Sequence, residues 1–324
     1  MSTGDYIIYT KELDYIGAPN QARVDLDEIN KFEKSLQKLI APLKNVLYRT
    51  IMARSQAIKA HGQRKGKLSS NNLTRLLFGD DRVFFKKEEN DTKDVAVQLV
   101  IDCSGSMGGN RIKSAAQSAW IFSEVLTQLG IKNEVVGFTT GLQNSKQLEK
   151  ARSSIFSRYA KEEFKKKYSK RYYDENIRFA PIYMPVFKSF DEKFSKENKA
   201  NLISATLSTY RSGDIMKVRE NVDGESLQYA FKRISSRHEK RKVMIVFSDG
   251  QPCCNEEDAS TDSSLLSKHL ENVVKEIEKT DVEIIGIGIE SKSVKDYYKN
   301  NIVVSNVEDL VETNLNTLKK ILLD

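Results

Sequence analysis

The chain has 324 residues, of which 39% are hydrophobic and 30% charged, and its formal net charge is +7. This length allows one large domain or two ordinary ones, and the composition indicates a globular protein. The longest apolar runs are far shorter than the roughly 20 residues of a membrane helix, and the N-terminus lacks the basic and apolar segments of a signal peptide. The three cysteines form neither a disulfide framework nor a zinc pattern, so we expect a cytoplasmic protein with no membrane segment.

Residues 1–90 are predicted to form an N-terminal arm and a helical region. Residues 1–25 show no hydrophobic period, which predicts an irregular arm. From residue 25 to residue 60, apolar residues recur every three or four positions, which predicts an amphipathic helix that Pro42 can kink or split. The opposite face of this helix is rich in lysine, and either solvent or a docking partner can cover it.

Residues 61–67 form a basic turn that superficially resembles a phosphate-binding loop. The glycine spacing is one residue short, and Leu68 stands where that motif needs Ser or Thr. We therefore expect that the chain does not hydrolyse ATP by itself. A capped short helix is predicted over residues 69–78 and a strand over residues 82–86.

The most informative stretch lies where a strand ends and a helix begins. Residues 95–101 are a continuous apolar run typical of a buried parallel strand, and residues 111–129 have one apolar helical face. Asp102, Ser104 and Ser106 lie in the turn between them, at the edge of an α/β sheet where ligands bind. Such oxygen ligands suit Mg²⁺ or Mn²⁺, although Asp and Ser are also common in solvated turns.

Two later stretches place carboxylates in similar positions. A second apolar strand, residues 243–247, runs into Ser248-Asp249-Gly250, and a loop at residues 221–227 carries Asp223 into a helix. Three such loops in this order resemble the metal-ion-dependent adhesion site (MIDAS) of von Willebrand factor A (VWA) domains. The resemblance implies one Mg²⁺ bound by Asp102, Ser104, Ser106 and Asp249, with one metal position left open for a partner's carboxylate.

The remaining pattern alternates strands with helices, which predicts an α/β fold with a Rossmann-like, doubly wound, mostly parallel sheet. We expect the VWA domain over residues 91–324, following the helical lead-in. Thr139 and Thr140 end one strand, and either hydroxyl lies within reach of the site's surroundings. The other expected elements are strands at 134–139, 282–289 and 302–304 and helices at 224–235, 263–279, 294–299 and 307–322.

A long helical and irregular insertion at residues 141–220 interrupts the alternation. It carries 18 Lys plus Arg and 10 Asp plus Glu, so its net charge of +8 accounts for the whole excess of the chain. Its basic residues alternate with aromatic ones, a pattern that fits nucleic acid, an acidic protein partner or a solvated helix equally well. Residues 176–190 contain two prolines and predict irregular or edge structure. The basic residues that would contact nucleic acid are Lys165, Lys166, Lys167, Lys170 and Arg171.

A tighter resemblance rests on six short stretches in order: Phe84-Phe-Lys86, Asp102-Cys-Ser-Gly-Ser-Met107, Gly137-Phe-Thr-Thr140, Glu220-Asn-Val-Asp-Gly-Glu225, Phe247-Ser-Asp-Gly-Gln-Pro252 and Gly286-Ile-Gly-Ile289. From about residue 31 to its end, the chain resembles the C-terminal region of the CobT-type subunit of aerobic cobaltochelatase. The loop with Asp223 is the most specific element, because most VWA domains carry Thr there. The chain lacks that subunit's long acidic region, as expected of a compact, for example phage-borne, relative.

This resemblance implies a hexameric AAA+ ATPase partner of the MoxR or chelatase class, which the VWA protein would couple to a client. The chain would then be a non-catalytic, metal-dependent interaction subunit, and the alternative is a nucleic-acid-binding protein that uses the insertion. An enzyme is disfavoured because no base or nucleophile accompanies the oxygen ligands. Three aspartates around a divalent cation would repel a partner carboxylate, so we predict that Asp223 acts through a bridging water.

Overall fold

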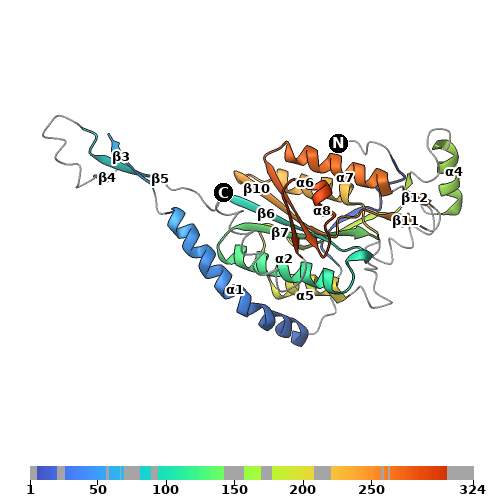
Figure 1. The fold of residues 1–324 in the computed structure, drawn as a ribbon, viewed down its shortest axis with the longest axis horizontal. Coiled ribbons are helices and arrows are strands. Elements are labelled where there is room, and N and C mark those ends of the chain that lie inside the picture. The colour runs from blue at the N-terminus through green and yellow to red at the C-terminus, as the bar shows by residue number, and fades with distance from the viewer. Residues whose placement is uncertain are drawn as a thin grey trace.

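A seven-stranded, mostly parallel sheet forms the centre of the computed structural model (Figure 1). Its order is β14-β13-β10-β6-β7-β9-β2, and all neighbours run parallel except β7 and β9. The strands are β2 (Tyr15–Gly17), β6 (Val95–Asp102), β7 (Lys132–Thr140), β9 (Ile182–Lys188), β10 (Arg241–Ser248), β13 (Val282–Ile289) and β14 (Asn301–Val304). The structure describes residues 6–19, 26–55, 58–65, 67–68, 81–88, 94–141, 157–168, 177–207, 220–256, 259–261 and 263–304.

The register of the central strands positions the candidate site. β6 and β10 are apolar runs buried almost throughout, as expected for parallel strands covered on both faces. Phe247 of β10 pairs with Ile101 of β6, so Asp102 and Ser248 occupy the next positions along neighbouring strands. The carboxyl ends of both strands therefore meet at one edge of the sheet.

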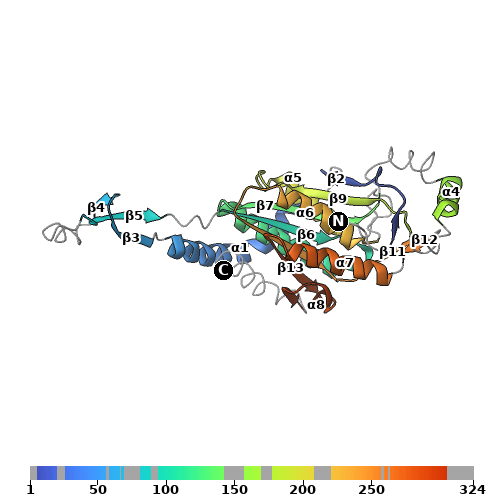
Figure 2. The same ribbon diagram turned by 90° about the horizontal axis from the view of Figure 1, so that it is seen from above.

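Helices cover both faces of the sheet (Figures 1 and 2). One face carries α1 (Leu26–Ser55), α2 (Asn110–Gln128) and α5 (Lys196–Leu207), and the other carries α6 (Asp223–Ser235), α7 (Ser263–Glu278) and α8 (Val294–Tyr297). On the first face, the fully buried Trp120 lies 5.3 Å from Phe32 and 5.5 Å from Phe194 between ring centroids. This is the doubly wound α/β fold that the sequence predicts.

The N-terminal arm departs from the prediction of irregular structure. β1 (Ile7–Ile8) pairs with β8 (Ile177–Arg178), and β2 extends the main sheet beside β9. The prediction of irregular or edge structure for residues 176–190 is also wrong for β9, because this strand lies between β7 and β2. The strands of the arm have only two and three residues and form by pairing with distant parts of the chain, whereas Pro185 inside the seven-residue β9 led to the prediction of edge structure.

A small antiparallel sheet stands apart from the main body at the end of α1 (Figure 1). It contains β3 (Ile58–Gln63), β5 (Phe84–Glu88) and β4 (Lys67–Leu68) in that order, and we call it the outer sheet. The strand predicted at residues 82–86 thus belongs to this sheet, and α1 continues through Pro42. The helices predicted at 69–78 and 307–322 lie outside the described residues. None of the described helices has the length and apolar character required to cross a membrane.

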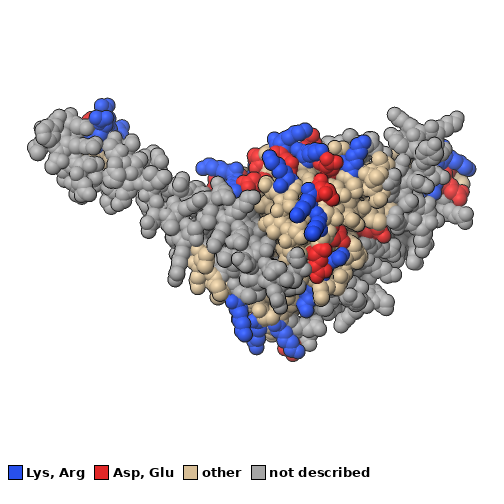
Figure 3. Space-filling view, viewed as in Figure 1, with Lys and Arg blue, Asp and Glu red and all other residues tan. Residues whose placement is uncertain are grey.

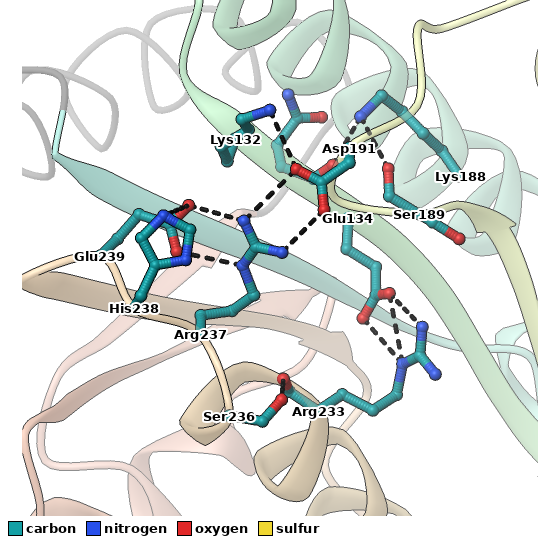
Figure 4. A network of polar contacts seen from close by, with 11 residues as sticks. Lys132, Glu134, Lys188, Ser189, Asp191, Arg233, Ser236, Arg237, His238 and Glu239 are labelled. Atoms are coloured by element: carbon teal, nitrogen blue, oxygen red, sulfur yellow. Dashed lines mark hydrogen bonds and ion pairs between the residues drawn. The ribbon is translucent and has the colours of Figure 1, made fainter.

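A polar network surrounds the start of β7, at the end of the sheet away from Asp102 (Figure 4). The fully buried Glu134 accepts hydrogen bonds from Arg233 of α6 at 2.5 Å and from Gln98 at 2.8 Å. Lys188 donates to the Asn133 carbonyl at 2.5 Å, and burial lowers the pKa of Lys188 to about 8. The network therefore attaches the C-terminal part of α6 to the sheet.

Candidate metal centre

The turn after β6 holds the first three candidate ligands. Asp102 is the last residue of the strand, and its Oδ1 accepts a hydrogen bond from the Ser104 amide at 2.9 Å. The Ser104 and Ser106 hydroxyl oxygens lie 3.0 Å apart. A short 3-10 turn, Gly105–Met107, then leads into α2. The carboxylate and both hydroxyls are thus gathered within one turn.

The loop after β10 is linked directly to this turn. The Ser248 hydroxyl donates to Asp102 Oδ2 at 2.9 Å and accepts from the Gly250 amide at 2.9 Å. Asp249 is buried beside it, and its carbonyl accepts a hydrogen bond from the Ser291 hydroxyl at 2.6 Å. Ser248 is not among the residues predicted as ligands, although its position at the end of a strand next to Asp249 is a signal that points to it.

Asp223 begins α6 and is 1% exposed. Its Oδ1 accepts a hydrogen bond from Asn221 Nδ2 at 2.8 Å, and the same amide donates to the Gln251 carbonyl at 2.9 Å. Asn221 and Cys253 also exchange backbone hydrogen bonds, so this loop is attached to the loop after β10. Asp223 Oδ2 is buried and has no hydrogen-bond partner among the described residues.

The hydroxyls of Thr139 and Thr140 support the Asp223 loop. Thr139 Oγ1 donates to the Glu220 carbonyl at 3.2 Å, and Thr140 Oγ1 accepts from the Glu220 amide at 3.1 Å. The sequence places both residues near the site, and these hydrogen bonds join the end of β7 to the residues that precede Asp223.

The three aspartates influence one another electrostatically. Burial raises the pKa of Asp102, and the charge of Asp249 raises it further. The pKa of Asp223 is also raised, first by burial and then by the charges of Asp102 and Asp249. Three buried carboxylates near one another are unfavourable unless a proton or a cation offsets their charge.

The donor set fits a hard divalent cation. The described part of the chain contains no group of three or more His, Cys, Asp or Glu side chains placed to hold a metal by themselves. A metal held here would also need the hydroxyls of Ser104 and Ser106, and carboxylate and hydroxyl oxygens suit Mg²⁺ or Mn²⁺. The unpartnered Asp223 Oδ2 is an additional acceptor that a metal-bound water would satisfy.

Two motif glycines, Gly224 next to Asp223 and Gly286 in β13, are required for close packing. A Cβ atom at Gly224 would lie 2.3 Å from His269 Nδ1 of α7, so only glycine allows the two helices to approach this closely. Similarly, a Cβ at Gly286 would lie 2.4 Å from the Tyr298 ring. The motif glycines therefore reflect close contacts around the site.

A buried charged cluster anchors the start of α6, and we call it the Arg178 cluster. Arg178 is fully buried, and its Nη1 and Nη2 donate to Asp14 at 3.0 and 3.1 Å. Its Nη2 also donates to Glu225 Oε2 at 3.0 Å, while the Tyr6 hydroxyl donates to Glu225 Oε1 at 2.9 Å. The cluster joins the N-terminal arm to the helix that begins with Asp223, and the local pattern of the sequence does not reveal it.

Arg111 lies at the rim of the site. Its side chain is 35% exposed, and its Nη1 lies 3.7 Å from Asp249 Oδ2 and donates to the Ser106 carbonyl at 3.2 Å. Its Nε lies 3.4 Å from Glu290 Oε2. Arg111 was not predicted as a residue of the site, because a lone arginine in a helix carries no recognisable pattern.

The basic part of the insertion forms α4 (Arg158–Tyr168), with Lys165, Lys166 and Lys167 in its last turn. Phe164 packs edge-on against Tyr9 and Phe179, at centroid distances of 4.8 and 6.2 Å. Lys170 and Arg171 lie outside the described residues. On the face drawn in Figure 3, described basic and acidic side chains intermingle instead of forming a patch of one sign.

Solved structures match this chain at low sequence identity. The PilB minor pilin from Streptococcus sanguinis is 14% identical, with a TM-score of 0.41 over 70% of this chain and 61% of that one. The vWF domain of the type V pili tip protein Mfa5 from Porphyromonas gingivalis is 10% identical, with a TM-score of 0.43 over 71% of this chain and 96% of that one.

Among curated proteins, the uncharacterized protein YojO of Bacillus subtilis (strain 168) is 22% identical over 301 residues. The alignment covers 89% of this chain but 40% of YojO, so this chain spans less than half the length of that relative. The model of the cobalamin biosynthesis protein CobT VWA domain matches residues 83–176 and 187–324, which is well over half of the sequence. The chain therefore belongs to the CobT VWA domain family.

Proposed function

We propose that this protein is a metal-ion-dependent protein-interaction subunit, or adaptor, that binds Mg²⁺ or Mn²⁺ at a MIDAS. Asp102, Ser104, Ser106 and Asp249 would hold the ion, and Asp223 would act through water. The main support is the buried Asp223 Oδ2, which lacks a hydrogen-bond partner among the described residues and lies on a loop attached to the Asp249 loop. When bound, the metal would supply positive charge that attracts a carboxylate oxygen from a partner.

The proposed partner is a hexameric AAA+ ATPase of the MoxR or chelatase class, and the carboxylate at the metal site would come from a client protein. This part of the proposal follows from membership of the CobT VWA domain family. We propose that the chain works in the cytoplasm and is not catalytic alone. Its task would be to connect the motor with the client.

The alternative, nucleic-acid binding through the insertion, has less support. Phe164 is engaged in packing against Tyr9 and Phe179, so this aromatic ring does not offer a free stacking platform for a base. The acidic residues Glu162 and Glu163 also lie on α4 beside its lysines. Because α4 carries both charge signs and packs through Phe164 against the rest of the chain, it fits a protein-contacting surface better than a nucleic-acid-binding one.

The test is a pull-down from native cells with Mg²⁺ or with a chelator. The bait is the wild type or an Asp102→Ala, Ser104→Ala double variant. Asp281→Ala is the matched control, because Asp281 is an exposed carboxylate paired with Lys242 far from the site. The proposal expects every bait to capture an AAA+ ATPase, and expects wild type and control to capture a client as well only when Mg²⁺ is present.

Two other outcomes change the conclusion. Capture of the ATPase only with Mg²⁺ and an intact site would mean that the metal site engages the motor and not the client. Recovery of nucleic acid alone, or of no ATPase under any condition, would contradict the adaptor function.

A further inference from the structure

We propose that Arg111 is a second anchor for acidic partners, so that the site selects a segment with two neighbouring carboxylates over one with a single carboxylate. One carboxylate would face the metal, and the other would pair with Arg111. This inference rests on the proposed metal-dependent function and names the chemistry of its ligand. It is carried by the position of Arg111, whose Nη1 lies 3.7 Å from Asp249 Oδ2.

The position of Arg111 at the start of α2 does not stabilise this helix. Arg111 is the second residue of this helix, and no acidic residue occupies the first turn. The N-terminal end of a helix carries partial positive charge, so a cation there is disfavoured. Its contacts with the Ser106 carbonyl and with Asp249 point to a role at the site.

Charge balance supports the same role. Three aspartates and a divalent cation sum to one net negative charge, which would repel an acidic partner. Arg111 adds one positive charge beside Asp249 without occupying a metal-ligand position, and Glu290 balances this charge until a ligand replaces it. Its guanidinium also offers several donors in a planar fork, which suits a carboxylate.

Glu290 pairs with Arg111 through an exposed contact, and a partner's carboxylate can take the place of Glu290. The two side chains are 35% and 41% exposed and lie 3.4 Å apart. Exposed pairs of this kind contribute little free energy, so a partner carboxylate can exchange with Glu290 at small cost. The intramolecular pair thus keeps the guanidinium directed along the rim until a ligand arrives.

Under this proposal, loss of the Arg111 charge changes the affinity for Mn²⁺ and the affinity for an acidic ligand in opposite directions. Removing the positive charge in Arg111→Gln should strengthen Mn²⁺ binding, by about threefold to tenfold, because a cation near the site is lost. The same change should weaken binding of an acidic ligand by about fivefold to tenfold. A residue that only stabilises the fold would weaken both.

The experiment uses the full chain, Mn²⁺ and three short labelled peptides with blocked termini, which carry no glutamate, one glutamate or two adjacent glutamates. Mn²⁺ affinity is measured by calorimetry, and peptide binding by fluorescence anisotropy at saturating Mn²⁺. We expect wild type and Arg111→Lys to prefer the peptide with two glutamates, and Arg111→Gln to bind both acidic peptides alike. Glu290→Gln should bind the two-glutamate peptide more tightly than wild type.

Arg241→Gln is the matched control, because Arg241 pairs with Glu283 at the opposite end of β10 and its loss changes the net charge equally. Unchanged peptide preference in Arg111→Gln, equal effects in the control, or weaker Mn²⁺ binding would overturn the role of Arg111. If Mn²⁺ binds but wild type does not prefer the two-glutamate peptide, this inference alone fails. If wild type binds no Mn²⁺, the proposed metal site fails with it.

Discussion

At the scale of single residues, the two kinds of aspartate in the site should differ in their contribution to metal binding. We expect Asp102→Asn to lower Mn²⁺ affinity by about a hundredfold or more, because a direct charged ligand is lost. Asp223→Asn should lower it by about tenfold, as for a group that acts through water. Calorimetric titration of both variants measures this difference, and equal losses would mean that Asp223 binds the metal directly.

Gly224 and His269 allow a test of close packing between α6 and α7. Gly224→Ala should reduce the free energy of unfolding by about 1–3 kcal/mol, because the added methyl group collides with the imidazole. In a His269→Ala background the same change should cost much less, since the space is then open. Urea unfolding of the four proteins in this cycle measures the coupling, and additive effects would contradict the contact.

The lowered pKa of His269 predicts that the stability of the protein depends on pH. Burial lowers the pKa of His269 to about 4, whereas the unfolded chain has the ordinary value of 6.5. Between these values the unfolded state binds more protons, so the contribution to stability is complete above pH 6.5 and is lost as the pH falls toward 4. The stability difference between wild type and His269→Gln should therefore shrink by about 1–3 kcal/mol over this range in urea titrations.

The residues of the site differ in how far the sequence reveals them. Asp102, Ser104, Ser106, Asp223 and Asp249 are predicted as candidate ligands because each follows an apolar strand or begins a helix. Ser248 and Asn221 make equally specific hydrogen bonds, but single serine and asparagine residues are too common in loops to stand out.

At the scale of elements, α6 is held at both ends by buried charges. Its first turn contacts the Arg178 cluster, and Arg233 near its last turn pairs with Glu134. These attachments fix the helix that carries Asp223, so the candidate ligand has little freedom to move. The strands and helices of the core were predicted because continuous apolar runs and helical periods are local signals. The Arg178 cluster was not predicted, because its members lie up to 219 residues apart.

The cluster predicts a non-additive response to mutation. Arg178→Met should cost about 3–5 kcal/mol of stability, because Asp14 and Glu225 then remain buried without their cation. A triple variant that also carries Asp14→Asn and Glu225→Gln should recover a large part of that loss, since no unpaired charge remains. Urea unfolding of both variants provides the comparison, and a triple variant less stable than Arg178→Met would contradict this account.

At the scale of the whole molecule, the main body and the outer sheet are spatially distinct (Figure 1). The family match begins at residue 83 and thus includes only the last strand of the outer sheet. The sequence indicates a strand there but not its partners, because β4 has only two residues and β3 lacks a strong apolar alternation. The described residues between 6 and 88 therefore divide between the arm attached to the main sheet, the long helix α1 and the outer sheet.

This arrangement predicts that the outer sheet is dispensable for the metal site. Replacing residues 58–88 by a flexible Gly/Ser linker should leave Mn²⁺ affinity unchanged within about twofold, since distant sites act independently. The unfolding transition of the main body should shift by about 1 kcal/mol or less. Calorimetry and urea unfolding of the shortened chain test both statements, and loss of Mn²⁺ binding would show that the two parts are coupled.

The arm also affects how this chain matures during its synthesis. Tyr6 and Asp14 leave the ribosome before their partners, because His269 follows Tyr6 by 263 residues and Arg178 follows Asp14 by 164. The buried Tyr6 and Leu13 side chains thus have no place to dock until most of the chain has been translated. Because such distant contacts form slowly, closure of the arm would be a late folding step, and the nascent chain would expose this apolar segment to chaperones throughout elongation.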